Sequence, residues 1–473
     1  MKNNNPKRWI KILLLFFLII LISITFINIK NNITAKKNQI RFLEKNLENK
    51  KSQIKNIHSK LLQKNLNLEN IIFDNGINFF KNSSRQIKIN NEQYELVEFK
   101  SDDIIFAKHP EASSSAYIHL NDDDIYLMTA TGQLVHTKYK DFRNEAFKMN
   151  VINTNIQDLI KYSEFYSSTA FGIKDFLISD KNQIFVSYIK KHYADCYSTS
   201  ILKGSLNKEY IEFKEFYSPK KCINKNESFY NGNKYDHMVI HQSGGRMFED
   251  NNILYFSTGE FRYRILAQDI NSDYGKLLSI NLLTNDKSII SMGHRNPQGI
   301  YIDNSSRNLF STEHGPSGGD EINILKLDIK SSGIPNYGWP ISSYGRHYHD
   351  DNDDKDSRYE LSPLYKSHKK HGFIEPIKYF DPSVGISQIT KINNNFYKSN
   401  QNSFVVGTMG SAKKIKEGML SLYFFSLKDD KVINEQLIPI GSRVRDLAFN
   451  DKENNLVLYL ETNNSLAILK KIN

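Results

Sequence analysis

Hydrophobic residues follow three different patterns along this chain of 473 residues. They are almost continuous from Trp9 to Ile29, and about 20 such residues are what a helix needs to cross a bilayer. They then recur every seven residues between 34 and 73, and beyond residue 74 they form short runs separated by turn residues. We therefore expect a transmembrane anchor within 1–33, an amphipathic spacer helix over 34–73 and an all-β body over 74–473.

The first segment has the features of an uncleaved signal anchor. Lys2, Lys7 and Arg8 precede the apolar stretch, and neither a small-residue cleavage motif nor a lipid-attachment cysteine follows it. A signal peptide that is removed after export is the alternative. Basic residues also flank the far side of the stretch, so the positive-inside rule does not decide its orientation.

The heptad positions of the second segment are Ile40, Leu47, Ile54, Leu61 and Leu68. Such a seam is typical of coiled coils, so this helix could join copies of the chain into a homo-oligomer or hold the body away from the membrane. Lysines at 50 and 64 also occupy seam positions, which favours the role of a spacer.

Six runs in the body share one theme, in which β-branched and aromatic residues lead into a small or polar end. They read IYLMTATG (125–132), IFVSYI (184–189), ILYFSTGE (253–260), NLFSTEHG (308–315), SFVVGTMG (403–410) and NLVLYLET (455–462). Successive runs begin roughly 50 to 95 residues apart, which suits one four-stranded blade with its loops. The pattern predicts a six-bladed β-propeller, in which loops from every blade converge on one axial face.

Composition adds two points to this pattern. The net charge is +11, but the lysines are scattered among asparagines and form no single stripe, so we expect no nucleic acid among the partners. Cys196 and Cys222 are the only cysteines. They suit one disulfide in an oxidising compartment, and two unrelated buried thiols are the alternative.

Polar residues that could carry chemistry lie in four short motifs. The motifs are HQSGGR (241–246), GHRNPQG (293–299), EHGPSGGDEIN (313–323) and NYGWP (336–340). Polar groups between glycine and proline in loops need partners, either a ligand or a hydrogen-bonded network. On the residues alone, His241 could be a proton acceptor or a turn residue, and Asp320 and Glu321 could be loop braces.

These motifs, in this order, resemble those of the glucose/sorbosone dehydrogenases, and the similarity runs from about residue 115 to the C-terminus. The resemblance implies a six-bladed propeller that binds pyrroloquinoline quinone (PQQ) and calcium. It implies that His241 is the base that takes a proton from the sugar hydroxyl as hydride passes to the quinone.

The same resemblance assigns the remaining site residues. Arg295 and Asn296 match cofactor contacts, and Arg443 and Arg445 match a C-terminal pair of arginines on the cofactor. Arginine can grip carboxylates through two hydrogen bonds, and the quinone carries three carboxylates. Gly315 and Pro316 match the residues whose carbonyls bind calcium, a cation that prefers oxygen. Without the resemblance, Arg443 and Arg445 could instead pair with acidic residues on neighbouring strands.

Three departures from the family pattern also appear in the sequence. Ile240 stands where the family often has aspartate before the histidine, and residues 169–174 (TAFGIK) replace a turn whose glutamine contacts the cofactor. The family's cofactor lysine falls in a segment that offers Lys413, Lys414 and Lys416. We expect Lys416, because it precedes Glu417 and Gly418 at the start of the next apolar run.

The sequence therefore predicts a PQQ- and calcium-dependent oxidoreductase that oxidises an aldose or related sugar. We expect a single-pass protein of the inner membrane, with the propeller in the periplasm and a quinone or cytochrome as electron acceptor. The alternative is a non-catalytic propeller that binds a carbohydrate or protein, which the altered positions at 240 and 169–174 motivate. A calcium-dependent lactonase fits less well, because that chemistry asks for several carboxylates around the metal.

Overall fold

The computed structural model describes residues 76–101, 115–121, 123–160, 170–225, 238–329, 333–347, 361–410 and 417–472, together with 36, 37, 40, 50 and 165. The predicted anchor (1–33) lies outside these residues. So does the predicted spacer helix (34–73), apart from residues 36, 37, 40 and 50, which are helical. Within the described residues, no helix combines the length and the apolar character needed to cross a membrane. Met1–Glu69 and Asn70–Asn473 are separate compact units, and all strands belong to the second.

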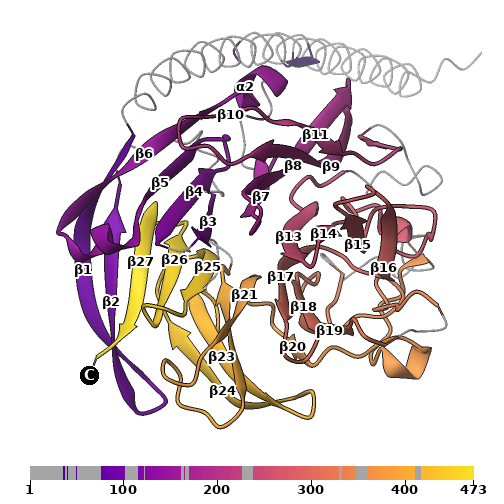
Figure 1. Cartoon of the computed structure of the whole chain (residues 1–473). Helices are drawn as coiled ribbons and strands as arrows, with labels where there is room; N and C mark the ends of the chain where they lie inside the picture. Colours follow the sequence, from indigo (N-terminus) through magenta and orange to yellow (C-terminus); the bar gives the residue numbers. More distant parts are fainter. Residues whose placement is uncertain are drawn as a thin grey trace, which may run out of the picture. The chain divides into compact units, whose positions relative to one another are not determined.

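The strands form six antiparallel groups that follow one another along the chain (Figure 1). The first contains β3 (Ala116–Asn121), β4 (Asp124–Thr129), β5 (Leu134–Lys138) and β6 (Ala146–Thr154). The second contains β7 (Ile173–Ile178), β8 (Gln183–Tyr193), β9 (Cys196–Ser205), β11 (Lys214–Tyr217) and the short β12 (Ile223–Asn224). The third contains β13 (Gly244–Asp250), β14 (Ile253–Thr258), β15 (Lys276–Asn281) and β16 (Lys287–Met292).

The remaining three groups consist of four strands each. The fourth contains β17 (Pro297–Asp303), β18 (Asn308–Glu313), β19 (Asp320–Lys326) and β20 (Lys378–Phe380). The fifth contains β21 (Ile386–Ile392), β22 (Asn402–Thr408), β23 (Ser421–Lys428) and β24 (Lys431–Pro439). The sixth contains β25 (Val444–Asn450), β26 (Asn455–Leu460), β27 (Ser465–Lys471) and β2 (Glu92–Lys100).

A few short elements connect or extend these groups. They are β10 (Tyr210–Ile211), α2 (Ile156–Leu159) and the 3₁₀ turns Tyr139–Arg143, Arg264–Ala267 and Lys369–His371. The strand β10 pairs with β6 in parallel.

The N-terminal strands close the ring. β2 pairs with β27 and so completes the last group, while β1 (Ile77–Ile89) pairs with both β2 and β6 and ties the last group to the first. The inner strands β3, β7, β13, β17, β21 and β25 each contact the next around the centre, and β25 contacts β3 (Figure 1). The all-β, propeller-like fold predicted from the sequence is confirmed.

The six recurring sequence runs are the second strands of the six groups, namely β4, β8, β14, β18, β22 and β26. Their central residues are buried on both faces, because each sheet is covered by a neighbour on either side. This double burial explains why the runs are continuously apolar, where a half-exposed strand would alternate apolar and polar residues. One apolar cluster fills the space between each pair of neighbouring groups.

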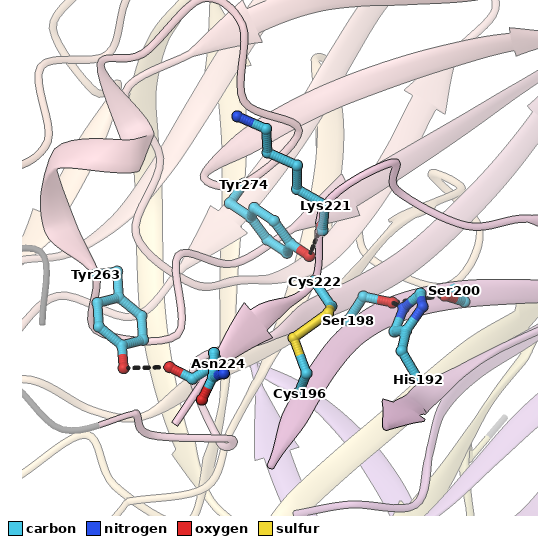
Figure 2. Close-up of a disulfide and its surroundings, with 9 residues drawn as sticks. All are labelled: His192, Cys196, Ser198, Ser200, Lys221, Cys222, Asn224, Tyr263 and Tyr274. Carbon is cyan, nitrogen blue, oxygen red and sulfur yellow. Dashed lines mark hydrogen bonds between the residues drawn. A yellow bond between two sulfur atoms is a disulfide. The ribbon is translucent and has the colours of Figure 1, made fainter. Parts of the chain in front are cut away.

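The two cysteines form a disulfide, as the sequence predicted (Figure 2). Cys196 opens β9 and Cys222 precedes β12, so the bond fastens the end of the second group onto its own third strand. Two tyrosines hold the same segment from the other side. Tyr263 Oη donates to the Asn224 carbonyl at 3.0 Å, and Tyr274 Oη donates to the Lys221 carbonyl at 2.6 Å.

Candidate functional site

The predicted site residues lie at one end of the ring. In every group the inner strand runs antiparallel to the second strand, so the start of the first faces the end of the second, as in Gly244↔Thr258, Pro297↔Glu313 and Val444↔Leu460. Segments before inner strands and after second strands therefore open toward the same end. The residues predicted for the site precede or begin β13, β17 and β25, or follow β18: His241, Arg295, Asn296, Gly315, Pro316, Arg443 and Arg445.

Arg295 is the most constrained of these residues. Its backbone N–H donates to Glu313 Oε2 at 2.8 Å, and its Nη1 donates to the His314 carbonyl at 2.9 Å. Its guanidinium also lies 5.4 Å from the centre of the Trp339 ring, a cation–π distance. Although it is charged, the side chain is buried, and these contacts hold it in a single orientation.

The turn that carries His241 contacts Arg295 through the neighbouring residue. In the amide orientation that satisfies both groups, Gln242 donates to Glu260 Oε1 at 2.7 Å and accepts from Arg295 Nη2 at 3.0 Å. Burial raises the pKa of Glu260 to about 7, although Arg295 and Arg264 act in the opposite direction. His241 itself is exposed.

Asn296 and Gln298 link this turn to the C-terminal arginines. Asn296 Oδ1 accepts from the Gly244 N–H at 3.1 Å and from Gln298 Nε2 at 3.0 Å. Gln298 Oε1 accepts in turn from Arg445 Nη1 at 3.5 Å. The backbone of the third group and side chains of the fourth and sixth groups are thus joined in one hydrogen-bonded chain.

Glu461 holds both C-terminal arginines. Its Oε2 accepts from Arg443 Nε at 2.9 Å and from Arg445 Nη2 at 3.0 Å, and Oε1 accepts from Arg445 Nη2 at 3.0 Å and from the Ser115 hydroxyl. Burial alone would raise the pKa of Glu461, but Arg445 and then Arg443 outweigh it and lower the pKa to about 2. The sequence left open whether these arginines pair with an acidic residue on a neighbouring strand. They do pair with Glu461, and this pairing also fixes the orientation of their side chains.

A charged network lies deeper, where the inner strands meet. Arg246 Nη1 bonds Asp175 Oδ1 at 3.2 Å and Asp446 Oδ1 at 2.9 Å, and Arg246 Nε donates to the Gln298 carbonyl at 2.8 Å. The same guanidinium lies 4.9 Å from the centre of the Tyr117 ring. Burial raises the pKa of both Asp175 and Asp446 against the pull of Arg246. Five of the six inner strands are cross-linked in this way, so this level of the ring is filled by a polar network.

The predicted calcium residues lie in a tightly braced loop. Asp320 Oδ1 accepts from the Gly315 N–H at 3.0 Å, and Asp320 Oδ2 accepts three backbone N–H groups from residues 384–386. Asp320 is therefore the loop brace that the sequence left open. The Pro316 carbonyl accepts from the Ser383 hydroxyl at 3.3 Å. Gly315 has no room for a side chain, because a Cβ there would lie 2.2 Å from the Gly319 carbonyl oxygen.

A second set of buried side chains supports this loop from behind. Glu313 Oε1 lies 3.0 Å from His294 Nδ1, and Glu321 Oε1 lies 3.1 Å from His368 Nε2. A cavity of about 10 Å³ lies between them and is lined also by Arg295, Gly315 and Trp339. Such a cavity holds one water at most, so it is too small for an organic ligand.

Two predicted features remain to be placed. Lys416, like Lys413 and Lys414, lies outside the described residues. Ile240 is buried in an apolar cluster with Phe261, Tyr263 and Tyr274, which explains an apolar residue at this position. Its side chain packs under the turn that presents His241.

Five buried side-chain atoms around this end have no hydrogen-bond partner within the part of the chain that the structure describes. They are Ser243 Oγ, Glu260 Oε2, Trp339 Nε1, Ser442 Oγ and Arg445 Nε. Buried polar atoms are rarely left unpaired without a reason such as a ligand or ordered water. Their grouping beside Arg295 and Arg443 indicates a site for a polar ligand.

Sequence reasoning missed Glu260 and Glu461 as partners of the site arginines. Both stand at the end of an apolar second strand, in the runs ILYFSTGE and NLVLYLET, and Glu313 ends the equivalent run NLFSTEHG. A carboxylate that ends a run buried on both faces will itself be buried, and buried carboxylates are paired. That signal could have found all three.

The fold and the arrangement of these residues define a class of protein: a β-propeller with an arginine-rich polar cluster at one axial end. Within that class, the sequence pattern of the glucose/sorbosone dehydrogenase family matches residues 148–470, and the chain belongs to this family.

Two curated proteins illustrate the relationship. Aldose sugar dehydrogenase YliI of Escherichia coli (strain K12) is 30% identical over 220 residues, which cover 43% of this chain and 53% of that protein. Quinoprotein glucose dehydrogenase B of Acinetobacter calcoaceticus is 31% identical over 130 residues, which cover 21% and 26%. The chain thus spans about half the length of YliI and less of the second protein.

Two solved structures share the fold. The apo form of the soluble aldose sugar dehydrogenase of Escherichia coli has a TM-score of 0.56 at 20% identity, covering 76% of this chain and 96% of that one. The PQQ-bound aldose sugar dehydrogenase of Streptomyces coelicolor has a TM-score of 0.52 at 16% identity, covering 78% and 96%. At these identities the likeness concerns the fold.

Proposed function

We propose that this chain is a PQQ- and calcium-dependent dehydrogenase that oxidises an aldose or a related sugar. The observation that carries the proposal is the convergence, at one end of the ring, of Arg295, Arg443 and Arg445 with unpaired buried polar atoms. Family membership and the PQQ-bound state of the Streptomyces coelicolor relative support the choice of ligand.

The residues present suit an anionic, planar cofactor. Arg445 Nε is a buried donor with no partner within the described residues, and Arg443 lies directly before β25, the strand that carries Arg445. Guanidinium groups bind carboxylates through paired hydrogen bonds. Glu461 holds the guanidinium groups of Arg443 and Arg445 in position, so that they could bind the carboxylates of the cofactor. Asn296 and Lys416 would add polar contacts with the cofactor.

Calcium would be held by the carbonyls of Gly315 and Pro316 together with oxygen atoms of the cofactor. Within the described residues there is no cluster of three or more histidine, cysteine or carboxylate side chains that could hold a metal by itself. Backbone carbonyls are suitable calcium ligands, and the brace from Asp320 fixes them in direction. The metal would therefore bind together with the cofactor.

His241 would act as the base. Its exposed imidazole stands on a turn fixed to Arg295 through Gln242, so it can reach a sugar hydroxyl that enters from the open end. When bound, the quinone supplies the acceptor for the hydride that leaves the sugar carbon. His241 takes the hydroxyl proton, and Arg295 and Asn296 keep the ligand in register with it.

We propose that the propeller works in the periplasm, anchored in the inner membrane by residues 1–33, and passes electrons to a quinone or cytochrome. The disulfide supports this location, because such bonds persist in oxidising compartments.

Dye reduction by the full-length chain in detergent tests the enzymatic function. Protein reconstituted with PQQ and calcium should reduce an artificial dye when an aldose is added. His241→Ala should lower this rate by about a hundredfold or more, since general-base catalysis contributes that much, while leaving PQQ binding intact. His371→Ala, in an exposed 3₁₀ turn, is the matched control and should keep full activity.

Titration calorimetry with PQQ and with glycans separates the enzyme from a binding module. Absence of PQQ binding by the wild-type protein refutes the dehydrogenase, and glycan binding without PQQ binding would favour the non-catalytic propeller.

A further inference from the structure

Lys174 occupies a central place that the predicted site residues do not use. It is the second residue of the inner strand β7 and directly precedes Asp175, which binds Arg246. Its side chain leaves the strand alongside Gly245 of β13, where a Cβ would lie 2.3 Å from the Cβ of Lys174. Gly245, the second glycine of the HQSGGR motif, therefore leaves space for Lys174 beside the turn that carries His241.

The ammonium of Lys174 has a backbone partner and two charged groups that act on it. Nζ donates to the Ala170 carbonyl at 2.6 Å, in the segment just before β7. The charged groups that act on it are Arg445, from β25, and Glu461, which follows β26. Burial, and then the positive charge of Arg445, lower the pKa of Lys174 to about 7 against the opposing effect of Glu461.

The balance of charge around this point favours an anion. Lys174, Arg443 and Arg445 are three cationic side chains, and Glu461 is the carboxylate that the two arginines share. Like charges in a buried setting repel strongly, and a bound anion would relieve that repulsion. Burial is the main cause of the lowered pKa of Lys174, and repulsion by Arg445 adds to it.

We propose that Lys174 is a further contact for the cofactor, and that its ammonium binds a carboxylate of PQQ at the centre of the ring. The inference rests on the proposed function and gives residues 169–174, which lack the family's glutamine, a contact of their own. Lys174 would bind from the side of β7 while Arg443 and Arg445 bind from the side of β25, so the ligand is held from two sides.

PQQ binding to the full-length chain in detergent provides the test, with no need for turnover. Trp339 lies beside Arg295, and the other tryptophan is Trp9 in the predicted anchor, so quenching of Trp339 fluorescence should report binding. Loss of one charged hydrogen bond should raise the dissociation constant of Lys174→Met about tenfold or more. Lys174→Arg keeps the charge and should stay within about threefold of the wild-type value.

The matched control is Lys391→Met. Lys391 is a half-buried lysine on the inner strand β21, but it pairs with Asp303 at 2.8 Å near the opposite end of the ring. This variant changes the net charge equally and should bind PQQ as the wild-type protein does.

Acetylation of the wild-type protein followed by mass spectrometry gives a second readout that does not depend on how variants fold. Lys174 should react in the apo protein and be protected at saturating PQQ. Unchanged affinity in Lys174→Met, or unchanged labelling at saturation, would overturn the role of Lys174 and leave the dehydrogenase standing. A wild-type protein that binds no PQQ would overturn both.

Discussion

Glu461 is the buried carboxylate that holds Arg443 and Arg445, so its replacement should show how far the site depends on it. Burial raises its pKa, but Arg445 and Arg443 lower it to about 2 from the ordinary value of 4.5. One pKa unit is worth about 1.4 kcal/mol, so the fold favours the ionised carboxylate by about 3 kcal/mol. Glu461→Gln keeps the shape and removes the charge. We expect the free energy of unfolding to fall by about 3 kcal/mol at neutral pH, or the melting temperature by about 4 °C in a unit of about 400 residues.

The effect should depend on pH in a defined direction. The folded-state pKa lies below the unfolded-state value, so the stabilisation is present above about pH 4.5 and is lost as the pH falls toward 2. At about pH 3 the difference between the wild-type protein and Glu461→Gln should have roughly halved.

Urea unfolding of the full-length chain, from neutral pH down to about pH 3, measures this difference. Glu145→Gln is the control, because Glu145 is largely exposed and its pair with Lys81 should contribute nothing measurable. An unfolding midpoint of Glu461→Gln equal to that of the wild-type protein at neutral pH would refute the reasoning. So would a difference that stays constant as the pH falls.

Three further changes probe the frame around the site. Arg246→Met leaves Asp175 and Asp446 buried without their cation and should lower the free energy of unfolding by about 3–5 kcal/mol in urea; an unchanged midpoint would contradict the cross-link. Replacing both cysteines by serine should lower the free energy of unfolding by about 3 kcal/mol, because the disulfide closes a loop with a sequence separation of 26. Reduced wild-type protein should then unfold at the same urea concentration as the variant. Glu260 has its pKa raised to about 7 by burial, so the wild-type protein should lose stability relative to Glu260→Gln as the pH rises from about 4.5 through 7; thermal melts that differ equally at all pH values would exclude this.

Local pattern in the sequence was enough to predict the propeller. The runs 253–260 and 455–462 are apolar throughout because each second strand is covered on both faces, and this is a property of the strand that its own residues record. Local pattern also predicted the loops before β13 and β17, because their glycine-rich motifs indicate the loops that lie at the axial end. The pairing of Cys196 with Cys222 followed from their being the only two cysteines.

The partners of the site residues were decided by tertiary structure alone. Arg246 meets Asp446 across 200 positions of the sequence, and Lys174 lies near Arg445 only because β7 and β25 both face the centre of the closed ring. Ring closure brings these side chains together, and the pKa of Glu461 or Lys174 depends on the charges and burial that result. A charge read along the chain has neither a partner nor a dielectric environment until the blades pack. The sequence therefore determined which groups stand at the axial end, and the fold determined which of them meet.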